Sequence, residues 1–229
     1  MPSAIVLAAG KSSRFNKGKL SKVILSINFK PVIYYSLFSL NKHPGISEII
    51  VVATENNLKD IGRIINKYKI NKVKKIVLGG KRRQDSVLCG LKHVNPRSEF
   101  VLIHDGARPF INRRIISSVI LSAKKFNASV TGVLVKATIK KADCNFWVKE
   151  TVDRESLWEI HTPQVFRKEI LVKAYQESGG LDFSDDAMLV ENSGVRVKLV
   201  RGSYSNIKLT TPEDLIIAEA LLKNKKILL

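Results

Sequence analysis

Short, mainly apolar runs alternate along the chain with longer segments in which apolar residues recur every three or four positions. The runs are rich in Ile, Val and Leu and lie at residues 3–8, 48–53, 73–78, 100–104 and 129–135. Short apolar runs bounded by turn residues are typical of buried strands. We therefore expect a buried strand at each of these places.

The segments between the runs have the spacing of helices. Helices are expected at residues 31–40, 58–68, 84–93 and 113–126. The first begins at Pro31, which the first turn of a helix tolerates. Later helices are expected at residues 167–177, 185–192 and 212–223, with a strand at 195–200.

This repeated strand–helix order predicts an α/β fold whose mainly parallel sheet carries helices on both faces. The chain has 229 residues and is 45% hydrophobic, which suits one domain over residues 1–229. Ligands of such sheets bind outside the carboxyl ends of the strands. The loops at residues 10–22, 79–86 and 105–109 each follow a strand, so we expect them to meet at one edge.

Residues 136–159 depart from the alternation. Two short strands are expected at residues 138–140 and 147–152, joined by a turn near 143–145. This pattern predicts a protruding β-hairpin inserted into the α/β order. An isolated hairpin is marginally stable, so we expect it to pack against another subunit.

Composition narrows the class of protein. No apolar run approaches the ~18 residues of a membrane span, and residues 1–5 do not have the pattern of a signal peptide. Cys89 and Cys144 lie far apart, which argues against a disulfide framework or a zinc site. These features favour a cytoplasmic protein in a reducing compartment.

The net charge is +19, and such an excess can attract nucleic acid, an acidic membrane or a polyanionic substrate. The lysines are spread along the whole chain, and Lys81-Arg82-Arg83 is the longest basic run. We interpret most of the charge as general lysine enrichment, with a few cations at a polyphosphate site. A basic nucleic-acid-binding protein remains a distant alternative, although no nucleic-acid-binding module is recognisable.

The loop after the first strand has the residues of a phosphate site. Ala8, Ala9 and Gly10 are small enough for backbone N–H groups to approach phosphate oxygens. Arg14 and Lys22 add positive charge. The loop lacks the first glycine of a Walker motif, and an ordinary turn with surface cations is the alternative.

A second glycine loop precedes the third expected helix. Gly79-Gly80, followed by the Ser86 hydroxyl, suits the close approach of a base or a sugar. The alternative is a tight turn with Asp85 as a helix-start residue.

Asp105 ends the fourth strand, where a carboxylate usually holds sugar hydroxyls or Mg²⁺. We interpret His104 as a buried, hydrogen-bonded core residue rather than a base. Asp105 and Arg108 could instead form a structural ion pair. Ser184-Asp185-Asp186 has the pattern of a helix cap with acidic first-turn residues.

Taken in order, these segments resemble the 2-C-methyl-D-erythritol 4-phosphate cytidylyltransferases of the non-mevalonate isoprenoid pathway. The resemblance runs from Ile5 to Glu219. Its most specific parts are residues 8–14, Gly79-Gly80 with Arg83 and Ser86, His104-Asp105 with Arg108-Pro109, and residues 151–154, 162–164, 206–208 and 212–214. Their conjunction, rather than any single motif, carries the resemblance.

The resemblance implies a Rossmann-like transferase that joins CMP from CTP to 2-C-methyl-D-erythritol 4-phosphate and releases pyrophosphate. It implies Mg²⁺ held mainly by CTP phosphates and water, without dedicated protein ligands. It also implies a homodimer in which the 136–159 hairpin reaches into the neighbour's site. The alternatives are a ribitol 5-phosphate cytidylyltransferase and a non-catalytic sugar-nucleotide sensor.

The resemblance also implies roles for individual residues. The catalytic residues are Arg14, Lys22, Arg154 and Lys208. The nucleotide-binding residues are Ala8, Ala9, Gly10, Gly80, Lys81, Arg83, Ser86, Asp105 and Ala107. The substrate-binding residues are Asp105, Arg108, Thr138, Arg154, Thr162, Ser184 and Lys208.

The chain departs from the family pattern around the catalytic lysine. Ser21-Lys22-Val23 stands where Pro-Lys-Gln is common in the family. The stretch from Arg14 to Lys22 is one residue longer than in members of the family. Lys17 and Lys19 compete for the role, although the downstream register favours Lys22. Ala137 and Ser184 replace an acidic residue and a Thr, respectively.

Overall fold

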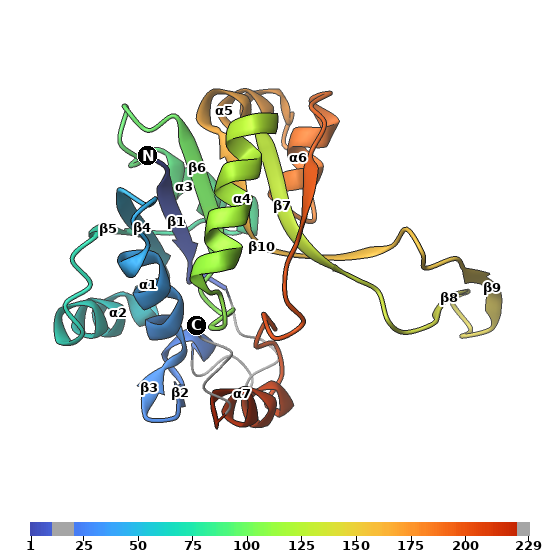
Figure 1. The fold of residues 1–229 in the computed structure, drawn as a ribbon, viewed down its shortest axis with the longest axis horizontal. Helices are drawn as coiled ribbons and strands as arrows, with labels where there is room; N and C mark the ends of the chain where they lie inside the picture. Colours follow the sequence, from blue (N-terminus) through green and yellow to red (C-terminus); the bar gives the residue numbers. More distant parts are fainter. Residues whose placement is uncertain (11–20, 224–229) are drawn as a thin grey trace.

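A seven-stranded sheet forms the centre of the computed structural model, which describes residues 1–10 and 21–223 (Figure 1). Its order is β11-β7-β10-β6-β1-β4-β5. The strands are β1 (Ser3–Leu7), β4 (Glu48–Ala53), β5 (Val73–Leu78), β6 (Phe100–Asp105), β7 (Ala128–Leu134), β10 (Trp158–Arg167) and β11 (Lys198–Arg201). Within this sheet β10 runs antiparallel to both neighbours, and the other pairs are parallel. The predicted α/β fold with a mainly parallel sheet is confirmed.

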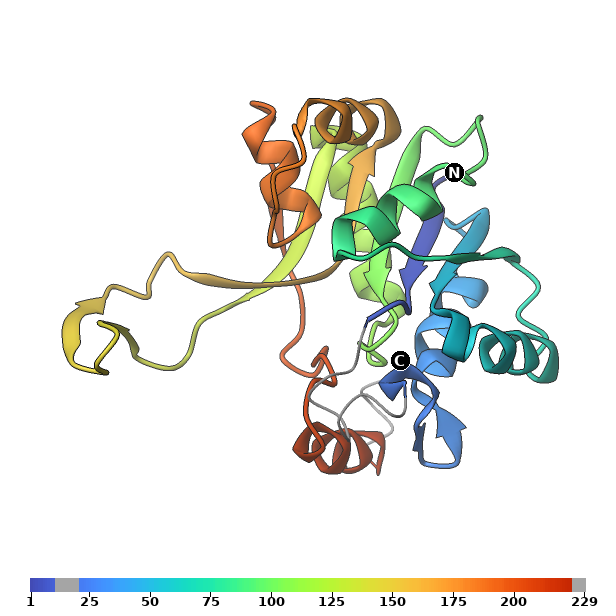
Figure 2. The same ribbon diagram turned by 180° about the vertical axis from the view of Figure 1, so that it is seen from behind.

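Helices cover both faces of the sheet. One core cluster contains residues from α1 (Val32–Lys42), α2 (Glu55–Lys67), α4 (Arg113–Phe126) and α7 (Glu213–Lys223). The other contains residues from α3 (Arg83–Leu91), α5 (Lys168–Glu177) and α6 (Asp186–Asn192). Figure 1 shows α1 and α4 in front of the sheet. Figure 2 shows the opposite face, which is covered by α3.

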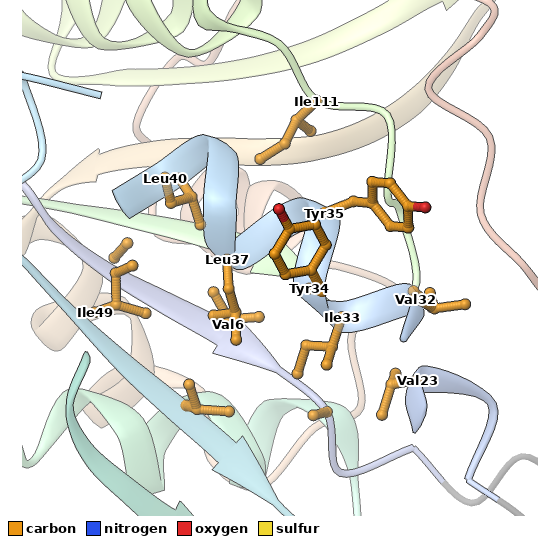
Figure 3. Packing of buried hydrophobic residues seen from close by; sticks show 14 of the residues in the cluster. Val6, Val23, Val32, Ile33, Tyr34, Tyr35, Leu37, Leu40, Ile49 and Ile111 are labelled. Carbon is orange, nitrogen blue, oxygen red and sulfur yellow. The ribbon is translucent and has the colours of Figure 1, made fainter. Parts of the chain in front are cut away.

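The unbroken apolar strands follow from these two cores. Successive side chains of a strand point to opposite faces, so in β1 Ala4 and Val6 join the first cluster while Ile5 joins the second. Figure 3 shows Leu37 of α1 pointing toward Val6, with Ile49 of β4 alongside. A strand buried on both faces has no polar face, and it reads as a continuous apolar run.

The inserted hairpin projects from the body as an arm between β7 and β10 (Figures 1 and 2). Its strands are β8 (Ile139–Ala142) and β9 (Val148–Val152). The turn is wider than the predicted 143–145, because Asp143 N donates to Trp147 O and Phe146 has a φ of 65°. The tip is apolar and exposed: Phe146 is 90% and Trp147 75% accessible to solvent.

The structure differs from the sequence prediction at several elements. The ten-residue strand β10 was not expected, because His161, Thr162 and Gln164 are polar and a register shift between His161 and Gln164 breaks the alternation. The short strands β2 (Ser26–Ile27) and β3 (Lys30–Pro31) and the 3-10 turn η2 (Lys22–Ile24) were also not expected.

Element boundaries move by a few residues. Helix α2 begins at Glu55 rather than at residue 58, because Thr54 and Asn57 form a capping box ahead of its apolar face. Strand β11 covers Lys198–Arg201 rather than 195–200. Among the helices of residues 1–10 and 21–223, none combines the length and the apolar character needed to cross a membrane.

Candidate active site

Three loops and one C-terminal segment surround a cavity of about 420 Å³ at the carboxyl edge of the sheet. This volume lies within the usual range for small-molecule sites. The described lining residues are Leu7, Ala8, Ala9, Gly10, Lys22, Val23, Gly80, Lys81, Arg82, Arg83, Ser86, Asp105, Ala107, Lys208 and Thr210. The loops that follow β1, β5 and β6 therefore meet at one edge, as expected.

Asn57 fixes both flanks of the loop that follows β1. Its Nδ2 donates to Ala8 O at 2.9 Å and to Ser21 Oγ at 2.8 Å, and its Oδ1 accepts from Thr54 N at 2.9 Å. The side chain is fully buried. Asn57 thus fixes Ala8 on one side of the loop and, through Ser21, supports the backbone that carries Lys22 on the other.

Of the two cations predicted to bind the triphosphate, Arg14 and Lys22, the structure describes Lys22. Lys22 lines the cavity at the start of η2. Arg14 and the competing Lys17 and Lys19 lie outside the described residues. Their predicted roles therefore stay predictions.

The Gly79-Gly80 loop packs too closely for side chains. A Cβ on Gly79 would lie 2.5 Å from Ala9 Cβ and 2.7 Å from Ser86 Oγ. Ser86 Oγ accepts from Gly80 N at 3.2 Å. Asp85 accepts from Arg82 N at 3.0 Å, so it is also the predicted helix-start residue. The tight turn with Asp85 at the helix start is confirmed, and the approach of a base or a sugar to Gly80 and Ser86 stays a prediction.

Asp105 is the carboxylate among the described lining residues, and it is surrounded by cations. Its Oδ2 lies 2.7 Å from Lys208 Nζ and 3.9 Å from Arg108 Nε, and its Oδ1 lies 3.6 Å from Arg83 Nε. Burial opposes ionisation of Asp105, but Lys208 and Arg83 outweigh it and hold the pKa of the carboxyl well below its usual range. Asp105 is therefore an anionic acceptor at neutral pH.

His104 and Thr162 support Asp105 from behind. Thr162 Oγ1 accepts from Asp105 N at 3.0 Å and lies 3.1 Å from His104 Nδ1. His104 is fully buried, and burial lowers its pKa to about 4. The imidazole is thus neutral at pH 7, which confirms its interpretation as a hydrogen-bonded core residue. Thr162, predicted to bind substrate, lies behind the cavity lining.

Cross-connections hold Lys208 toward Asp105. Leu209 N donates to Ala107 O at 2.9 Å, and Arg108 Nη1 donates to Asn206 O at 2.8 Å. Asn206 Nδ2 donates in turn to Thr162 O at 2.8 Å. Arg108 is buried and connects the loop after β6 to Asn206. It is predicted to bind substrate, but it is not among the described residues that line the cavity.

Three further predicted substrate contacts, besides Arg108 and Thr162, lie outside the cavity of their own chain. Thr138 and Arg154 belong to the exposed arm, which projects away from the sheet (Figure 1). Arg154 Nη1 donates to Lys136 O. Ser184 lines a separate hollow beside α6, where Asp185 is the N-cap.

Two polar residues outside the predicted nucleotide-binding and substrate-binding sets are buried beside this site. Asn57 has been described above, and Asp186 lies 2.6 Å from Arg83 Nη1. Locally, each residue has the pattern of a helix start. Asp186 is 103 positions from Arg83 in the chain, so no local pattern could have paired them.

The donor set around the cavity suits a phosphate-bound metal better than a protein-bound one. Among the described residues, no group of three His, Cys, Asp or Glu side chains could hold a metal ion. Asp105 is the carboxylate among the described lining residues, and Mg²⁺ commonly uses one or two carboxylates together with substrate phosphates. The cationic lining (Lys22, Lys81, Arg82, Arg83 and Lys208) is suited to those phosphates.

Comparison with known proteins gives close relatives. A protein of Caldanaerobacter subterraneus subsp. tengcongensis named 2-C-methyl-D-erythritol 4-phosphate cytidylyltransferase is 47% identical over 224 residues, covering 96% of this chain and 98% of that protein. A protein of Clostridium acetobutylicum with the same name is 44% identical over 230 residues, covering 99% and 100%.

Solved structures agree with these relatives. The crystal structure of 4-diphosphocytidyl-2C-methyl-D-erythritol synthase from Anaerococcus prevotii has a TM-score of 0.85 at 33% identity, covering 96% of this chain and 97% of that one. The 2-C-methyl-D-erythritol 4-phosphate cytidylyltransferase of Thermus thermophilus has a TM-score of 0.80 at 28% identity, covering 97% and 100%. The family model for 2-C-methyl-D-erythritol 4-phosphate cytidylyltransferase matches residues 3–224. This chain therefore belongs to the 2-C-methyl-D-erythritol 4-phosphate cytidylyltransferase (IspD) family.

Proposed function

We propose that this chain transfers CMP from CTP to 2-C-methyl-D-erythritol 4-phosphate and releases pyrophosphate. The observation that carries the proposal is the cavity lined by Lys22, Lys81 and Lys208, in which the buried Asp105 lies 2.7 Å from Lys208 Nζ. Such a site attracts polyphosphate and offers one acceptor for a hydroxyl. Relatives with this activity in their names match nearly the whole chain at 44–47% identity.

The proposed chemistry needs no protein base. A phosphate oxygen of the substrate attacks the α-phosphorus of CTP, and the bond from that phosphorus to the bridging oxygen of pyrophosphate breaks. A phosphate monoester is largely dianionic at neutral pH, because its second pKa is about 6. The buried, neutral His104 does not line the cavity, which agrees with this scheme.

Catalysis would then rest on positioning and charge stabilisation. Lys22, with Arg14 from outside the described residues, would bind the triphosphate. Gly80, Lys81 and Ser86 would surround the base, and Asp105 and Ala107 would hold sugar hydroxyls. Lys208, held by Asp105 at 2.7 Å, would receive the substrate phosphate.

We also propose that Mg²⁺ accompanies CTP and is held mainly by phosphate oxygens and water. When bound, the metal would neutralise charge on the phosphates. The protein would contribute the cationic lining, with Asp105 as the nearest carboxylate.

The arm supports a further part of the proposal, a homodimer that shares its active sites. Thr138 and Arg154 are exposed and lie outside the cavity of their own chain. The arm tip exposes Phe146 and Trp147, and a free hairpin is marginally stable. In a dimer the arm would bring Thr138 and Arg154 to the neighbour's substrate. Cys89 and Cys144 are free thiols, in keeping with a cytoplasmic location.

A pyrophosphate-release assay tests the reaction. Four nucleoside triphosphates are crossed with 2-C-methyl-D-erythritol 4-phosphate and ribitol 5-phosphate, with Mg²⁺ present or chelated. We expect release with CTP and the methylerythritol substrate, lost on chelation. Preference for ribitol 5-phosphate would replace the proposed substrate, and no release with any pair would favour a sensor.

A further inference from the structure

Asp186, at the start of α6, is a buried carboxylate that the proposed reaction does not use. It is 1% exposed, and both of its oxygens are engaged. Oδ2 lies 2.6 Å from Arg83 Nη1, and Oδ1 accepts from the Tyr175 hydroxyl at 2.7 Å. Burial and the neighbouring Asp186 carboxylate both raise the pKa of Tyr175, so its hydroxyl stays a donor at neutral pH.

Arg83 therefore lies between two carboxylates at unequal distances. Its contact with Asp186 has the 2.6 Å length of a charge-assisted hydrogen bond, whereas its Nε lies 3.6 Å from Asp105 Oδ1. The other oxygen of Asp105 is 2.7 Å from Lys208. Asp105 thus divides its two oxygens between a close lysine and a more distant arginine.

We propose that Asp186 is a positioning residue that holds Arg83 back from Asp105. Asp105 Oδ1 then remains an acceptor for a hydroxyl of the bound nucleotide. This inference rests on the proposed function, because it deepens the role given there to Asp105. Arg83 is the first residue of α3 and follows the Gly80-Lys81 loop. The series of contacts from Asp186 through Arg83 to Asp105, called the relay below, therefore joins the nucleotide side of the cavity to α6, which lies outside it.

Independent contacts hold the same segment in place without Asp186. Arg82 Nη1 donates to Gly180 O at 2.9 Å, and Gln84 Nε2 donates to Leu181 O at 2.7 Å. Phe183 N donates to Gln84 Oε1 at 3.1 Å. Loss of the Asp186 charge therefore leaves α3 and the segment before α6 attached, and Asp186→Asn is expected to fold.

The expected consequence is a loss of nucleotide affinity rather than of turnover. In Asp186→Asn the remaining carboxylate near Arg83 is Asp105, and the guanidinium closes on Oδ1. A hydrogen bond to a charged group is typically worth a factor of roughly ten or more in binding. We expect the KM for CTP to rise roughly tenfold, with kcat changed by less than about threefold, because Lys22 and Lys208 keep their places.

Asp185→Asn is the matched control. It makes the same charge change one position earlier, and Asn caps a helix as well as Asp does. Asp185 accepts from Gln164 Nε2 and Met188 N, and no contact with Arg83 is recorded among the described residues. Its KM for CTP should stay within about twofold of wild type. An equal rise in both variants would assign the effect to α6 as a whole and overturn the relay.

A double-mutant cycle tests whether Asp186 acts through Arg83. In the Arg83→Gln background, Asp186→Asn should add no further rise in KM. Tyr175→Phe should raise KM in the same direction but by less, since the carboxylate remains. A lowered melting temperature with unchanged KM in Asp186→Asn would show a purely structural role and overturn the proposal.

Calorimetric titration of the same variants with CTP and Mg²⁺ separates this inference from the proposed function. If wild type binds CTP but does not release pyrophosphate, the proposed function fails while the Kd still tests the relay. The relay predicts roughly tenfold weaker binding in Asp186→Asn and unchanged binding in Asp185→Asn. Equal Kd values for wild type and Asp186→Asn would reject it.

Discussion

The cavity edge and the arm belong to one chain but are stabilised in different ways. At the cavity edge, buried polar groups connect distant segments: Asn57 joins Ala8 to Ser21, and Arg108 joins the loop after β6 to Asn206. The arm has one local strand pair and an exposed apolar tip. The described cavity edge is thus built by the fold of a single chain, whereas the arm exposes apolar surface that the proposed homodimer would cover.

Loss of Lys22 should have the largest effect on the cavity edge. We expect Lys22→Ala to lower kcat by roughly 10²–10³, about 2.7–4 kcal/mol of transition-state stabilisation, because a fixed cation near the triphosphate is removed. Steady-state kinetics measures the loss, and thermal unfolding should show little change. Near-normal kcat would remove Lys22 from the mechanism.

Acid should weaken the body of the protein through His104. The folded pKa of His104, about 4, lies below its usual 6.5, so between these pH values the unfolded chain binds the extra proton. This contribution to stability is complete above pH 6.5 and is lost as the pH falls toward 4, on the order of 3 kcal/mol in all.

Urea unfolding of wild type and His104→Asn at pH 7.5, 6, 5 and 4 measures this loss. The variant should start less stable at pH 7.5 but show a flatter decline. Because His43 and His161 also have lowered pKa values from burial, part of the decline should remain. Parallel curves for the two proteins would contradict the assignment to His104.

Arg154→Ala tests the arm. If the guanidinium binds substrate phosphate in the neighbour's site, its loss should cost about 1.5–3 kcal/mol in kcat/KM for the sugar phosphate. The KM for CTP should change little, and so should the melting temperature, because the side chain is exposed. Lys149→Ala, also exposed on the arm, is the matched control. Equally small effects of Arg154→Ala and Lys149→Ala would show that the arm contributes only general positive charge, and would contradict a specific contact of Arg154 with substrate.

Asn57→Ala tests the buried polar contacts of the cavity edge. It leaves Ala8 O and Thr54 N without their buried partner, which should cost about 1–3 kcal/mol in the free energy of unfolding. Lower kcat/KM should accompany the loss, because Ser21 next to Lys22 is released as well. Asn56→Ala, exposed one residue earlier, should stay within about 0.5 kcal/mol of wild type.

Sequence patterns predicted the buried strands, which local periodicity determines, and the place of the cavity, which the strand ends determine. The buried strands β1, β4 and β6 follow from apolar runs, and the meeting of the three loops follows from their place after parallel strands. Strand β10 was not predicted, because His161 and Thr162 are polar and the pairing register shifts between His161 and Gln164. Buried polar residues in a strand have no periodic signal; their partners, such as His104 for Thr162, are visible only in three dimensions.

The same limit applies to the site. Small residues and cations after strands indicated Ala8, Gly80 and Lys22, and the family resemblance indicated Lys208. The structure brings these four residues to one cavity. Asn57 and Asp186 look like ordinary helix starts in the sequence, because their contacts with Ala8 and Arg83 span 49 and 103 positions. In the proposed homodimer the arm would reach a second chain, and the pattern of one sequence does not place that chain.

Co-expression of two impaired variants, assayed at sugar phosphate concentrations below KM, tests most directly whether the cavity of one chain is completed by the arm of another. Differently tagged Lys22→Ala and Arg154→Ala chains are purified together and assayed for pyrophosphate release from CTP and 2-C-methyl-D-erythritol 4-phosphate. A mixed dimer has one site with both residues intact, so random pairing should restore about a quarter of wild-type activity. Activity no higher than the average of the two variants alone, in a sample shown to contain both tags, would contradict a shared site.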